Sequence, residues 1–453
     1  MLGMGNMRQW LMNISLVGGW FPAAAFAVIA VLSVTLLVSA AVSKRDGRIL
    51  ATVLPIGVAA VSGMVGYVVA WLLSDVFVVF GVGLGSRVMS WVAAGFAIAG
   101  FAIVHIVLSR GMMRVAAAIL TVFAILAAAI GIDQSYGEYA TIGSLFGEDS
   151  YSQADLTGLA KRKDLITVAQ WRKQAANGTI RNIPANGTVN KIDIPATKSQ
   201  FEARKALVYL PPAALADSKR KPALPVVLML SGQPGSPGRV FQAGGIQTMM
   251  DGYAKTHDGL APIVIAADQL GADSHNTLCV DSKVYGNALT YLTQDVVDWV
   301  KTNLPAAQDA KDWAIAGFSQ GATCSLQIGV NHPDLFGTMI PTDSEIKPTN
   351  GSRQEMIDRF FDGDTTAYEN QVPVNAIRNH APTHQMLIIG AGEKDTTSIR
   401  NVKTIAPVAA KAGMRVAAVE SSGNAHDWHA VQDVLRYGLA VFGHDTGLDG
   451  ANP

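Results

Sequence analysis

The sequence predicts an α/β fold, with a mostly parallel sheet flanked by helices, preceded by four transmembrane helices. Two observations predict it: four long apolar stretches lie before residue 130, and short apolar runs separated by helix-length segments follow. Charged residues gather after residue 130, and 453 residues exceed what one compact core usually holds. We therefore expect a transmembrane anchor at 1–132, a linker at 133–185 and a second domain at 186–453.

The four apolar stretches each approach the length of about 20 residues that a helix needs to cross a bilayer. They are Trp20–Val42, Ile49–Leu73, Val88–Leu108 and Met112–Ile130. A cleaved signal peptide would have a shorter apolar core and would not be followed by three more stretches. Apart from Arg114, at the very start of the fourth stretch, the only acidic or basic residue inside a stretch is His105, near one end. We interpret the helices as an anchor in the lipid bilayer; a proton relay or ligand site at His105 is the alternative.

Loop charges predict how the anchor is oriented, because Lys and Arg of short loops stay on the cytoplasmic side. The first and third loops hold the basic residues Lys44, Arg45, Arg48, Arg110 and Arg114. The segment after the fourth stretch carries four acidic residues with no basic residue between them. We expect a multi-pass protein of the cell membrane whose N-terminus and second domain face the outside.

Charge and cysteine usage exclude several classes of protein. The net charge is +0 with no basic run, so nothing indicates a nucleic-acid partner. The two cysteines, Cys279 and Cys324, lack the close spacing of a zinc site or a redox dithiol. In an extracytoplasmic domain they could form one disulfide, and two buried thiols are the alternative.

The second domain begins with runs of β type and then alternates strands with helices. The runs Thr188–Ile194 and Ala206–Leu210 suggest an antiparallel entry to a sheet, after a polar, helix-compatible stretch at Asp155–Ala176. Six later apolar runs are typical of buried parallel strands: Pro225–Leu230, Ala261–Ala267, Trp313–Ala316, Thr338–Pro341, Gln385–Gly390 and Arg415–Glu420. The first two of these six should be neighbours. Helical spacing recurs at Tyr291–Asn303, Ile399–Ala412 and Asp427–Phe442.

The strongest local signal is the sequence Gly317-Phe318-Ser319-Gln320-Gly321, between a predicted strand and a helix-compatible segment. This context is what a G-x-S-x-G nucleophile elbow requires. The two glycines let the strand and helix backbones meet in a sharp turn, which exposes Ser319 at the carboxyl edge of the sheet. We predict that Ser319 is a nucleophile; a simple glycine turn is the alternative.

A serine hydroxyl needs a base to take its proton, so a histidine should follow along the chain. His426 lies in a turn-rich loop after the last predicted strand and before the final helix, which is the expected place. His429 would lie about one turn into that helix, where a surface or packing role suits it better. A metal site at these two histidines lacks a third ligand at useful spacing.

The third member of such a site is a carboxylate that orients the imidazole and stabilises its cation. Asp395 and Glu393 both follow the predicted strand Gln385–Gly390, and we prefer Asp395. The order Ser319, Asp395, His426 is that of α/β-hydrolases. Asp268 and Asp343 also follow predicted strands, and we expect them to serve structure.

An acyl-transfer site also needs backbone N–H groups for the oxyanion. One should be that of Gln320, the residue after the nucleophile. The other should come from the loop Ser231–Gly235 after an early strand, with Gln233 as the expected donor. An ordinary Pro-Gly turn is the alternative at this loop.

Over residues Gly187–Phe442 the chain resembles the esterase family that includes esterase D, feruloyl esterases and the antigen 85 mycolyltransferases, especially its membrane-anchored actinobacterial members. The matching motifs are the elbow, His426 with Trp428, and Gly286-Asn287-Ala288 followed by Tyr291-Leu292-Thr293 and Asp295-Val296. The resemblance implies a triad of Ser319, His426 and an acid in the Glu393–Asp395 loop. Ala425 departs from the glycine that many relatives have before the histidine.

The resemblance implies a serine-dependent ester hydrolase that works through an acyl-enzyme, with no cofactor. With the expected outside location, acyl esters of the cell envelope, such as envelope lipids or acylated sugars, become the expected substrates. An envelope acyltransferase that moves the acyl group to a sugar hydroxyl is the alternative within the same chemistry. A catalytically silent module that binds glycan or scaffolds a complex is the alternative from another class.

Overall fold

The computed structural model describes residues 2–42, 48–77, 84–148, 151–159, 164–381 and 383–451. The chain divides into two compact units, Met1–Asp149 with Ala425–Asp427 and Ser150–Asn424 with Trp428–Pro453. Residues 425–427 are by connectivity the loop between strand β13 (Arg415–Ser421) and helix α18 (Trp428–Asp445), and they are described with the second unit.

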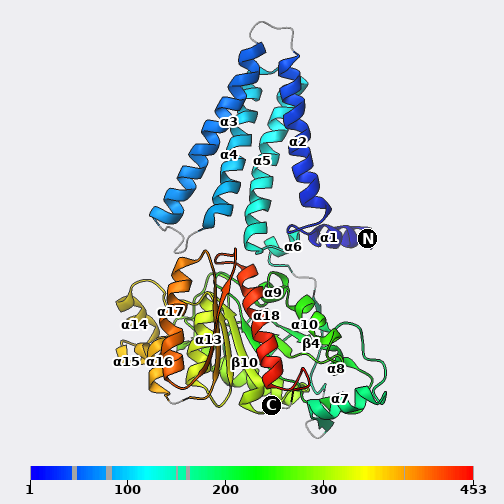
Figure 1. The fold of residues 1–453 in the computed structure, drawn as a ribbon, viewed down its shortest axis with the longest axis vertical. Helices are drawn as coiled ribbons and strands as arrows, with labels where there is room; N and C mark the ends of the chain where they lie inside the picture. The colour runs from blue at the N-terminus through cyan, green and yellow to red at the C-terminus, as the bar shows by residue number, and fades with distance from the viewer. Residues whose placement is uncertain are drawn as a thin grey trace. The chain divides into compact units, whose positions relative to one another are not determined.

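The first unit is helical (Figure 1). Its elements are α1 (Leu2–Met12), α2 (Trp20–Ala41), α3 (Arg48–Trp71), η1 (Leu72–Val76), α4 (Gly85–Leu108), α5 (Met112–Tyr136) and α6 (Ile142–Leu145). Among the described residues, four helices are long and apolar enough to cross a membrane: Trp20–Ala41, Ile49–Val76, Gly85–Leu108 and Met112–Tyr136. The predicted apolar helices are therefore confirmed, and Lys44 and Arg45 of the first loop lie outside the described residues.

Small residues let these helices pack closely. Helix α4 packs against both α3 and α5. A Cβ placed on Gly63 of α3 would lie 3.1 Å from the Cβ of Ala97, and one placed on Gly95 of α4 would lie 2.8 Å from the Cβ of Ala128. Interfaces of this kind are typical of membrane helices, whose association depends on van der Waals packing. His105 is buried among the helices and contacts the ring of Phe101.

The second unit is built on a sheet of nine strands in the part of the chain that is described. Their order is β1-β3-β4-β7-β6-β10-β11-β12-β13. The bounds are β1 (Ser152–Gln153), β3 (Thr188–Ile192), β4 (Ala206–Leu210), β6 (Val226–Leu230), β7 (Ile263–Ala266), β10 (Trp313–Phe318), β11 (Thr338–Thr342), β12 (Met386–Gly392) and β13. Only β4 runs antiparallel to its neighbours among these described strands. The predicted antiparallel entry and the parallel pairing of β6 with β7 are confirmed.

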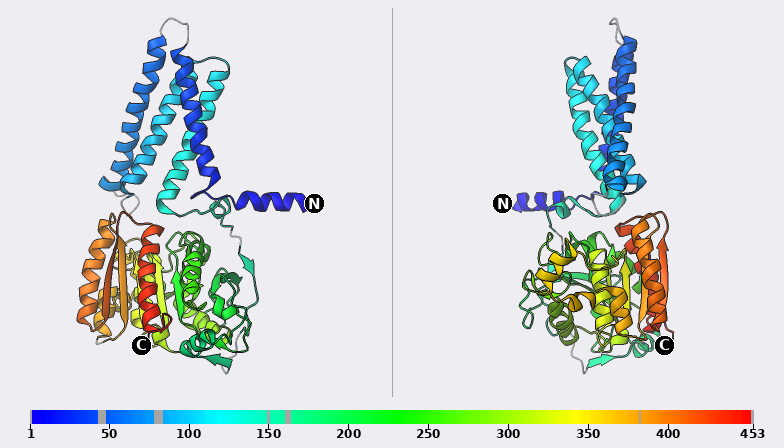
Figure 2. Two further views of the ribbon diagram at one scale, coloured as in Figure 1. Left: turned by 45° about the vertical axis from the view of Figure 1, so that its right-hand side comes forward. Right: turned by 90° about the vertical axis from the view of Figure 1, so that its left-hand side faces the viewer.

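Helices cover both faces of this sheet, as Figures 1 and 2 show. The described helices of this unit are α7 (Val168–Ala176), α8 (Pro212–Leu215), α9 (Pro237–Gln242), α10 (Ile246–Lys255), α11 (Ala288–Thr290), η3 (Tyr291–Asp295), α12 (Val296–Asn303), η4 (Ala310–Asp312), α13 (Gln320–Asn331), α14 (Arg353–Phe360), α15 (Thr365–Glu369), α16 (Pro373–Asn379), α17 (Thr396–Lys411) and α18. Short two-stranded pairs join β2 (Leu165–Ile166) to β5 (Lys221–Pro222) and β8 (Asp281–Ser282) to β9 (Gly286–Asn287).

Alternation along the strands sorts the core into two layers. Leu228 of β6 packs in one apolar cluster with residues of α12, α13 and α17. Its neighbours Val227 and Met229 pack in another cluster with residues of α9, α10 and α18. Successive side chains of a strand point to opposite faces, so a strand buried on both faces reads as one continuous apolar run.

The segment expected as a linker differs from the prediction. Residues 150–185 belong to the second unit, so the division falls near residue 150 and not at 185. The physical reason is Trp171, which is fully buried in the core and whose indole N–H donates to the carbonyl of Asp258. The helix within this segment begins only at Val168, because Thr167 caps it with a hydrogen bond from the N–H of Gln170.

Asp268 has the structural role that the sequence predicted for it. It is fully buried, pairs with Arg204 at 2.8 Å and accepts N–H groups from Leu270 and Gly271. Removing the Asp268 charge takes away the buried acceptor of Arg204, which keeps its second partner, Asp273. We expect Asp268→Asn to lower the free energy of unfolding by about 1–3 kcal/mol in urea titrations of the detergent-solubilised protein. The exposed pair Lys198–Asp298 provides the control, since Asp298→Asn should cost less than about 1 kcal/mol.

Candidate active site

Ser319 stands at the turn between β10 and α13. Its φ of 54° and ψ of −116° lie in a region that non-glycine residues rarely adopt, and such strain gathers at functional sites. The turn depends on the flanking glycines, because a Cβ on Gly317 would lie 2.2 Å from the carbonyl oxygen of Gly321. A Cβ on Gly321 would lie 2.3 Å from the carbonyl oxygen of Ser231. The observed geometry is that of the predicted elbow, with a half-buried serine at its tip.

Parallel pairing carries the candidate residues to one edge of the sheet. The strands β10, β11, β12 and β13 are consecutive neighbours and all parallel. Ser319, Asp343, Asp395 and His426 follow their respective carboxyl ends. Neighbouring strands lie about 4.8 Å apart, so residues at these ends come close although they are distant in sequence.

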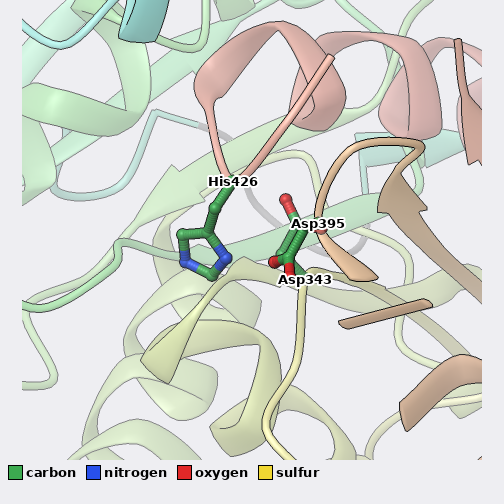
Figure 3. A group of neighbouring side chains, drawn as sticks. All are labelled: Asp343, Asp395 and His426. Carbon is green, nitrogen blue, oxygen red and sulfur yellow. The ribbon is translucent and has the colours of Figure 1, made fainter. Parts of the chain in front are cut away.

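Asp343, Asp395 and His426 form a cluster at this edge (Figure 3). One carboxylate oxygen of each aspartate and one ring nitrogen of the histidine all lie within 4.8 Å of one another. Figure 3 shows one nitrogen of the imidazole facing the two carboxyl groups. Both aspartates are buried, with 1% and 5% of their surface exposed, and His426 is half-buried. Two carboxylates beside one imidazole can orient its tautomer and stabilise its cation.

Backbone N–H groups hold both aspartates in place. Asp395 caps α17, and its Oδ1 accepts the N–H groups of Thr397 at 3.1 Å and Ser398 at 3.0 Å. The Oδ1 of Asp343 accepts the N–H of Gly392 at 2.9 Å. These bonds fix the orientation of both carboxyl groups at the sheet edge.

Glu393, the alternative acid, points elsewhere. It is exposed, and its Oε2 accepts the N–H of Gly423 at 2.6 Å and the hydroxyl of Ser422 at 3.0 Å. The hydrogen bond from Gly423, followed by that from Ser422, lowers the pKa of the Glu393 carboxyl. These contacts brace the loop that leads to His426, and Glu393 is not part of the cluster that Asp395 forms with Asp343 and His426.

The sequence predicts a structural role for Asp343, and the structure adds a place in the cluster beside His426. Its place in the cluster follows from the sheet order, because β11 lies between β10 and β12. The available signal was an aspartate directly after a predicted strand that follows the nucleophile. That signal indicates a place beside His426 only when it is known that β11 lies between β10 and β12.

Trp428 connects the histidine loop to the elbow. Its buried ring lies 5.0 Å, between centroids, from the ring of Phe318, which precedes the nucleophile. The same loop is closed by the carboxylate of Asp427, which accepts the N–H of Ala425 at 2.8 Å. The contact between Trp428 and Phe318 therefore links the loop that carries His426 to the turn that carries Ser319. His429 lies in the first turn of α18, as expected.

The predicted oxyanion loop runs beside the nucleophile. A Cβ on Gly232 would lie 3.6 Å from the Cβ of Ser319. The next residue, Gln233, forms a cis peptide bond with Pro234, and its side-chain amide donates to the carbonyl of Ser274 at 3.3 Å. The N–H of Gln320 opens α13 on the other side of the serine. Gln320 therefore adjoins Ser319 along the chain, and Gly232, which precedes Gln233, adjoins it from the neighbouring loop.

Cys279 and Cys324 are joined in a disulfide, with their Cα atoms 5.7 Å apart. Cys324 lies one helical turn after Gln320 on α13, and Cys279 lies on the loop before β8. Of the two arrangements that the sequence left open, the structure contains the disulfide. It ties the helix that begins at the elbow to a loop more than 40 residues earlier.

Comparison with known proteins gives a family and a curated relative. The family model named Esterase, described as "Putative esterase", matches residues 198–438. An uncharacterised protein of Corynebacterium glutamicum is 32% identical over 333 residues, which cover 72% of this chain and 74% of the relative. The match to this relative is longer than the family match.

Solved structures with low sequence identity include several hydrolases. An S-formylglutathione hydrolase from Agrobacterium tumefaciens is 15% identical, with a TM-score of 0.47 over 59% of this chain and 98% of its own. A ferulic acid esterase from Anaeromyces mucronatus is 19% identical, with a TM-score of 0.43 over 57% and 91%.

The contact of Gly321 with the strand beneath it predicts the effect of one added methyl group. We expect Gly321→Ala to destabilise the protein by about 1–3 kcal/mol, because the new Cβ must push α13 away from the backbone of β6. Gly252→Ala is the matched control: it lies within helix α10, its Cβ meets no atom within 4 Å, and alanine favours helix. Thermal unfolding in detergent measures both, and equal melting temperatures would contradict the predicted contact.

Proposed function

Because the chain belongs to the esterase family, we propose that it is a serine-dependent carboxylic-ester hydrolase acting through an acyl-enzyme on acyl esters of the cell envelope. One observation carries the mechanism: His426 and two buried aspartates cluster at the sheet edge where the strained Ser319 ends its strand. An activated serine needs such a base, and the base needs a group that orients it.

In the proposed reaction the Ser319 hydroxyl attacks the ester carbonyl while His426 takes its proton. Asp395 holds the imidazole and stabilises the cation. The N–H groups of Gln320 and Gln233 stabilise the oxyanion. The C–O bond of the ester then breaks, and the leaving alcohol takes the proton from His426. Water, activated by the same base, releases the carboxylic acid and restores the Ser319 hydroxyl.

We further propose that the chain crosses the cell membrane four times and that the second unit faces outside. The basic residues of the first and third loops support this orientation. The Cys279–Cys324 disulfide supports it independently, since disulfides persist in oxidising compartments and are rare in the cytosol. An outside location makes envelope lipids and acylated sugars the substrates within reach.

A fluorophosphonate probe tests the nucleophile and the base directly. We expect the detergent-solubilised wild type to be labelled and Ser319→Ala not to be labelled, because the probe bonds to the activated serine. His426→Ala should be labelled about 10²–10⁴-fold more slowly, the range that general-base catalysis contributes. His429→Ala, three residues away, is the control and should keep the wild-type rate. No labelling of folded wild type would overturn the proposal.

Substitution of the three candidate acids separates their roles. We expect Asp395→Asn to lower kcat by about 10³–10⁴-fold, because the imidazole loses the group that fixes its tautomer. Asp343→Asn should cost less, because Asp395, which holds the imidazole in the proposed mechanism, is still present. Glu393→Gln should leave kcat unchanged, since its carboxylate faces Gly423. Steady-state hydrolysis of p-nitrophenyl acetate measures all three. A larger loss from Glu393→Gln than from Asp395→Asn would reassign the acid.

Reporter fusions test the orientation. Alkaline phosphatase folds only outside the cytoplasm, so a fusion after Gly137, beyond the last apolar helix, should be active. A fusion after Arg110, in the third loop, should be inactive. The reverse pattern would place the second unit in the cytoplasm and contradict the proposed substrates.

A further inference from the structure

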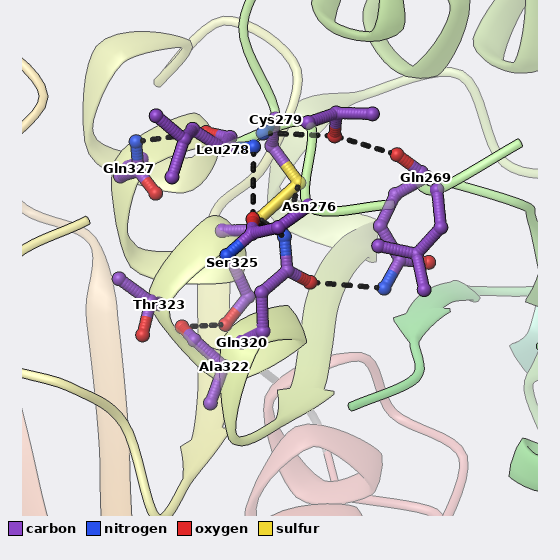
Figure 4. Close-up of a disulfide and its surroundings, with 12 residues drawn as sticks. Gln269, Asn276, Leu278, Cys279, Gln320, Ala322, Thr323, Ser325 and Gln327 are labelled. Carbon is purple, nitrogen blue, oxygen red and sulfur yellow. Dashed lines mark hydrogen bonds between the residues drawn. A yellow bond between two sulfur atoms is a disulfide. The ribbon is translucent and has the colours of Figure 1, made fainter. Parts of the chain in front are cut away.

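Three side-chain amides, one of them on the residue that follows the candidate nucleophile, form a hydrogen-bonded line beside the disulfide (Figure 4). The line consists of Gln269, Gln320 and the half-buried Asn276, and it passes beside the disulfide. Gln269 is fully buried and Gln320 is 7% exposed. Buried amides are costly unless each donor finds an acceptor, so a network at this place needs a reason.

Gln269 donates in two directions. Its Nε2 lies 2.6 Å from the carbonyl oxygen of Ser231 and 3.2 Å from the Oε1 of Gln320. An amide NH₂ group has two protons, so both bonds can form at once. One bond therefore reaches the loop that leads to Gln233, and the other reaches the residue after the nucleophile. The proposed oxyanion donors belong to these same two segments.

Asn276 and Cys324 determine the orientation of the Gln320 side-chain amide. Its Nε2 lies 3.2 Å from the Oδ1 of Asn276 and 3.3 Å from the Sγ of Cys324. Asn276 in turn donates to the carbonyl of Thr349 at 2.9 Å. With acceptors on that side, the Oε1 of Gln320 must face Gln269. Donors and acceptors thus alternate from Ser231 to Thr349.

The position of the Ser231 carbonyl matters for the loop that follows. Gly232 comes next and lies against Ser319, and Gln233 follows it. A hydrogen bond that holds the Ser231 carbonyl limits rotation of the peptide groups after it. Gly321, on the other side, already touches the same carbonyl through its backbone.

We infer that Gln269 is a positioning residue that sets the spacing between the two N–H donors of the oxyanion hole. It acts through Ser231 and Gln320 and does not itself touch the substrate. This inference rests on the proposed esterase function. Donors placed in advance stabilise the developing oxyanion more than the ester carbonyl, so their loss should appear in kcat and not in KM.

The chain offers a matched control in Gln385. It is also buried, and its Nε2 donates to two backbone carbonyls, those of Gly329 and Phe336, each at 2.7 Å. It precedes β12 at the amino end of the strand, whereas Asp395 and the cluster follow the carboxyl end. Gln269→Met and Gln385→Met therefore remove the same chemical group at opposite edges of the sheet.

The test is hydrolysis of p-nitrophenyl acetate by the full-length protein in detergent, with active sites counted by fluorophosphonate titration. Counting active sites removes any loss that comes from misfolded molecules. We expect Gln269→Met to lower kcat per active site by about 10²-fold with KM within about twofold. Gln269→Glu should lower kcat per active site to a similar extent, because a carboxylate cannot donate to the Ser231 carbonyl or to the Oε1 of Gln320. Gln385→Met should lower the melting temperature and leave kcat per site unchanged.

Three outcomes would overturn the inference: an unchanged kcat per site in both Gln269 variants, a rise in KM alone, or an equal loss of kcat in Gln385→Met. Failure of the wild type to be labelled or to hydrolyse the ester is a different result. It would overturn the proposed function itself and would be seen before any variant is made.

Discussion

The rest of the site depends on the close backbone contact between α13 and β6. Gly321 reaches the carbonyl of Ser231 with no room for a Cβ, and Gly317 meets the backbone of Gly321 in the same way. This contact bends the chain sharply enough to hold Ser319 at a positive φ. It also brings the start of α13 against the loop after β6. The proposed nucleophile and both segments of the proposed oxyanion hole are therefore positioned by one packing constraint.

Parallel pairing of the strands brings Asp343, Asp395 and His426 to the same edge of the sheet as Ser319. The strands β10 to β13 run side by side in chain order, so each carboxyl end delivers its next residues to the same edge. Backbone bonds to Gly392 and to the start of α17 then hold Asp343 and Asp395 against His426. Carboxylates beside an imidazole stabilise its cation. In the proposed mechanism His426 becomes such a cation when it takes the proton of Ser319.

The disulfide and the amide network both restrain the start of α13, which follows the turn at Ser319. Cys324 and Gln320 lie one turn apart on α13, so the bond to Cys279 and the bond to Gln269 restrain the same end of the helix. Both Cys279 and Gln269 lie more than 40 residues before α13 residues Cys324 and Gln320, to which they are joined. A site whose donors must be placed within tenths of an ångström gains from restraints that arrive from several directions.

The sequence by itself determined the alternation of strands and helices, the apolar helices, the elbow at Ser319 and the loop position of His426. These follow from local patterns: hydrophobic periodicity, glycine spacing and chain order. Tertiary structure decided that Asp343 joins Asp395 beside His426, that the two cysteines pair, that Gln269 lies between Ser231 and Gln320, and that Trp171 belongs to the core. Such contacts join residues tens of positions apart, and no local pattern states which strands become neighbours or which buried donor meets which acceptor.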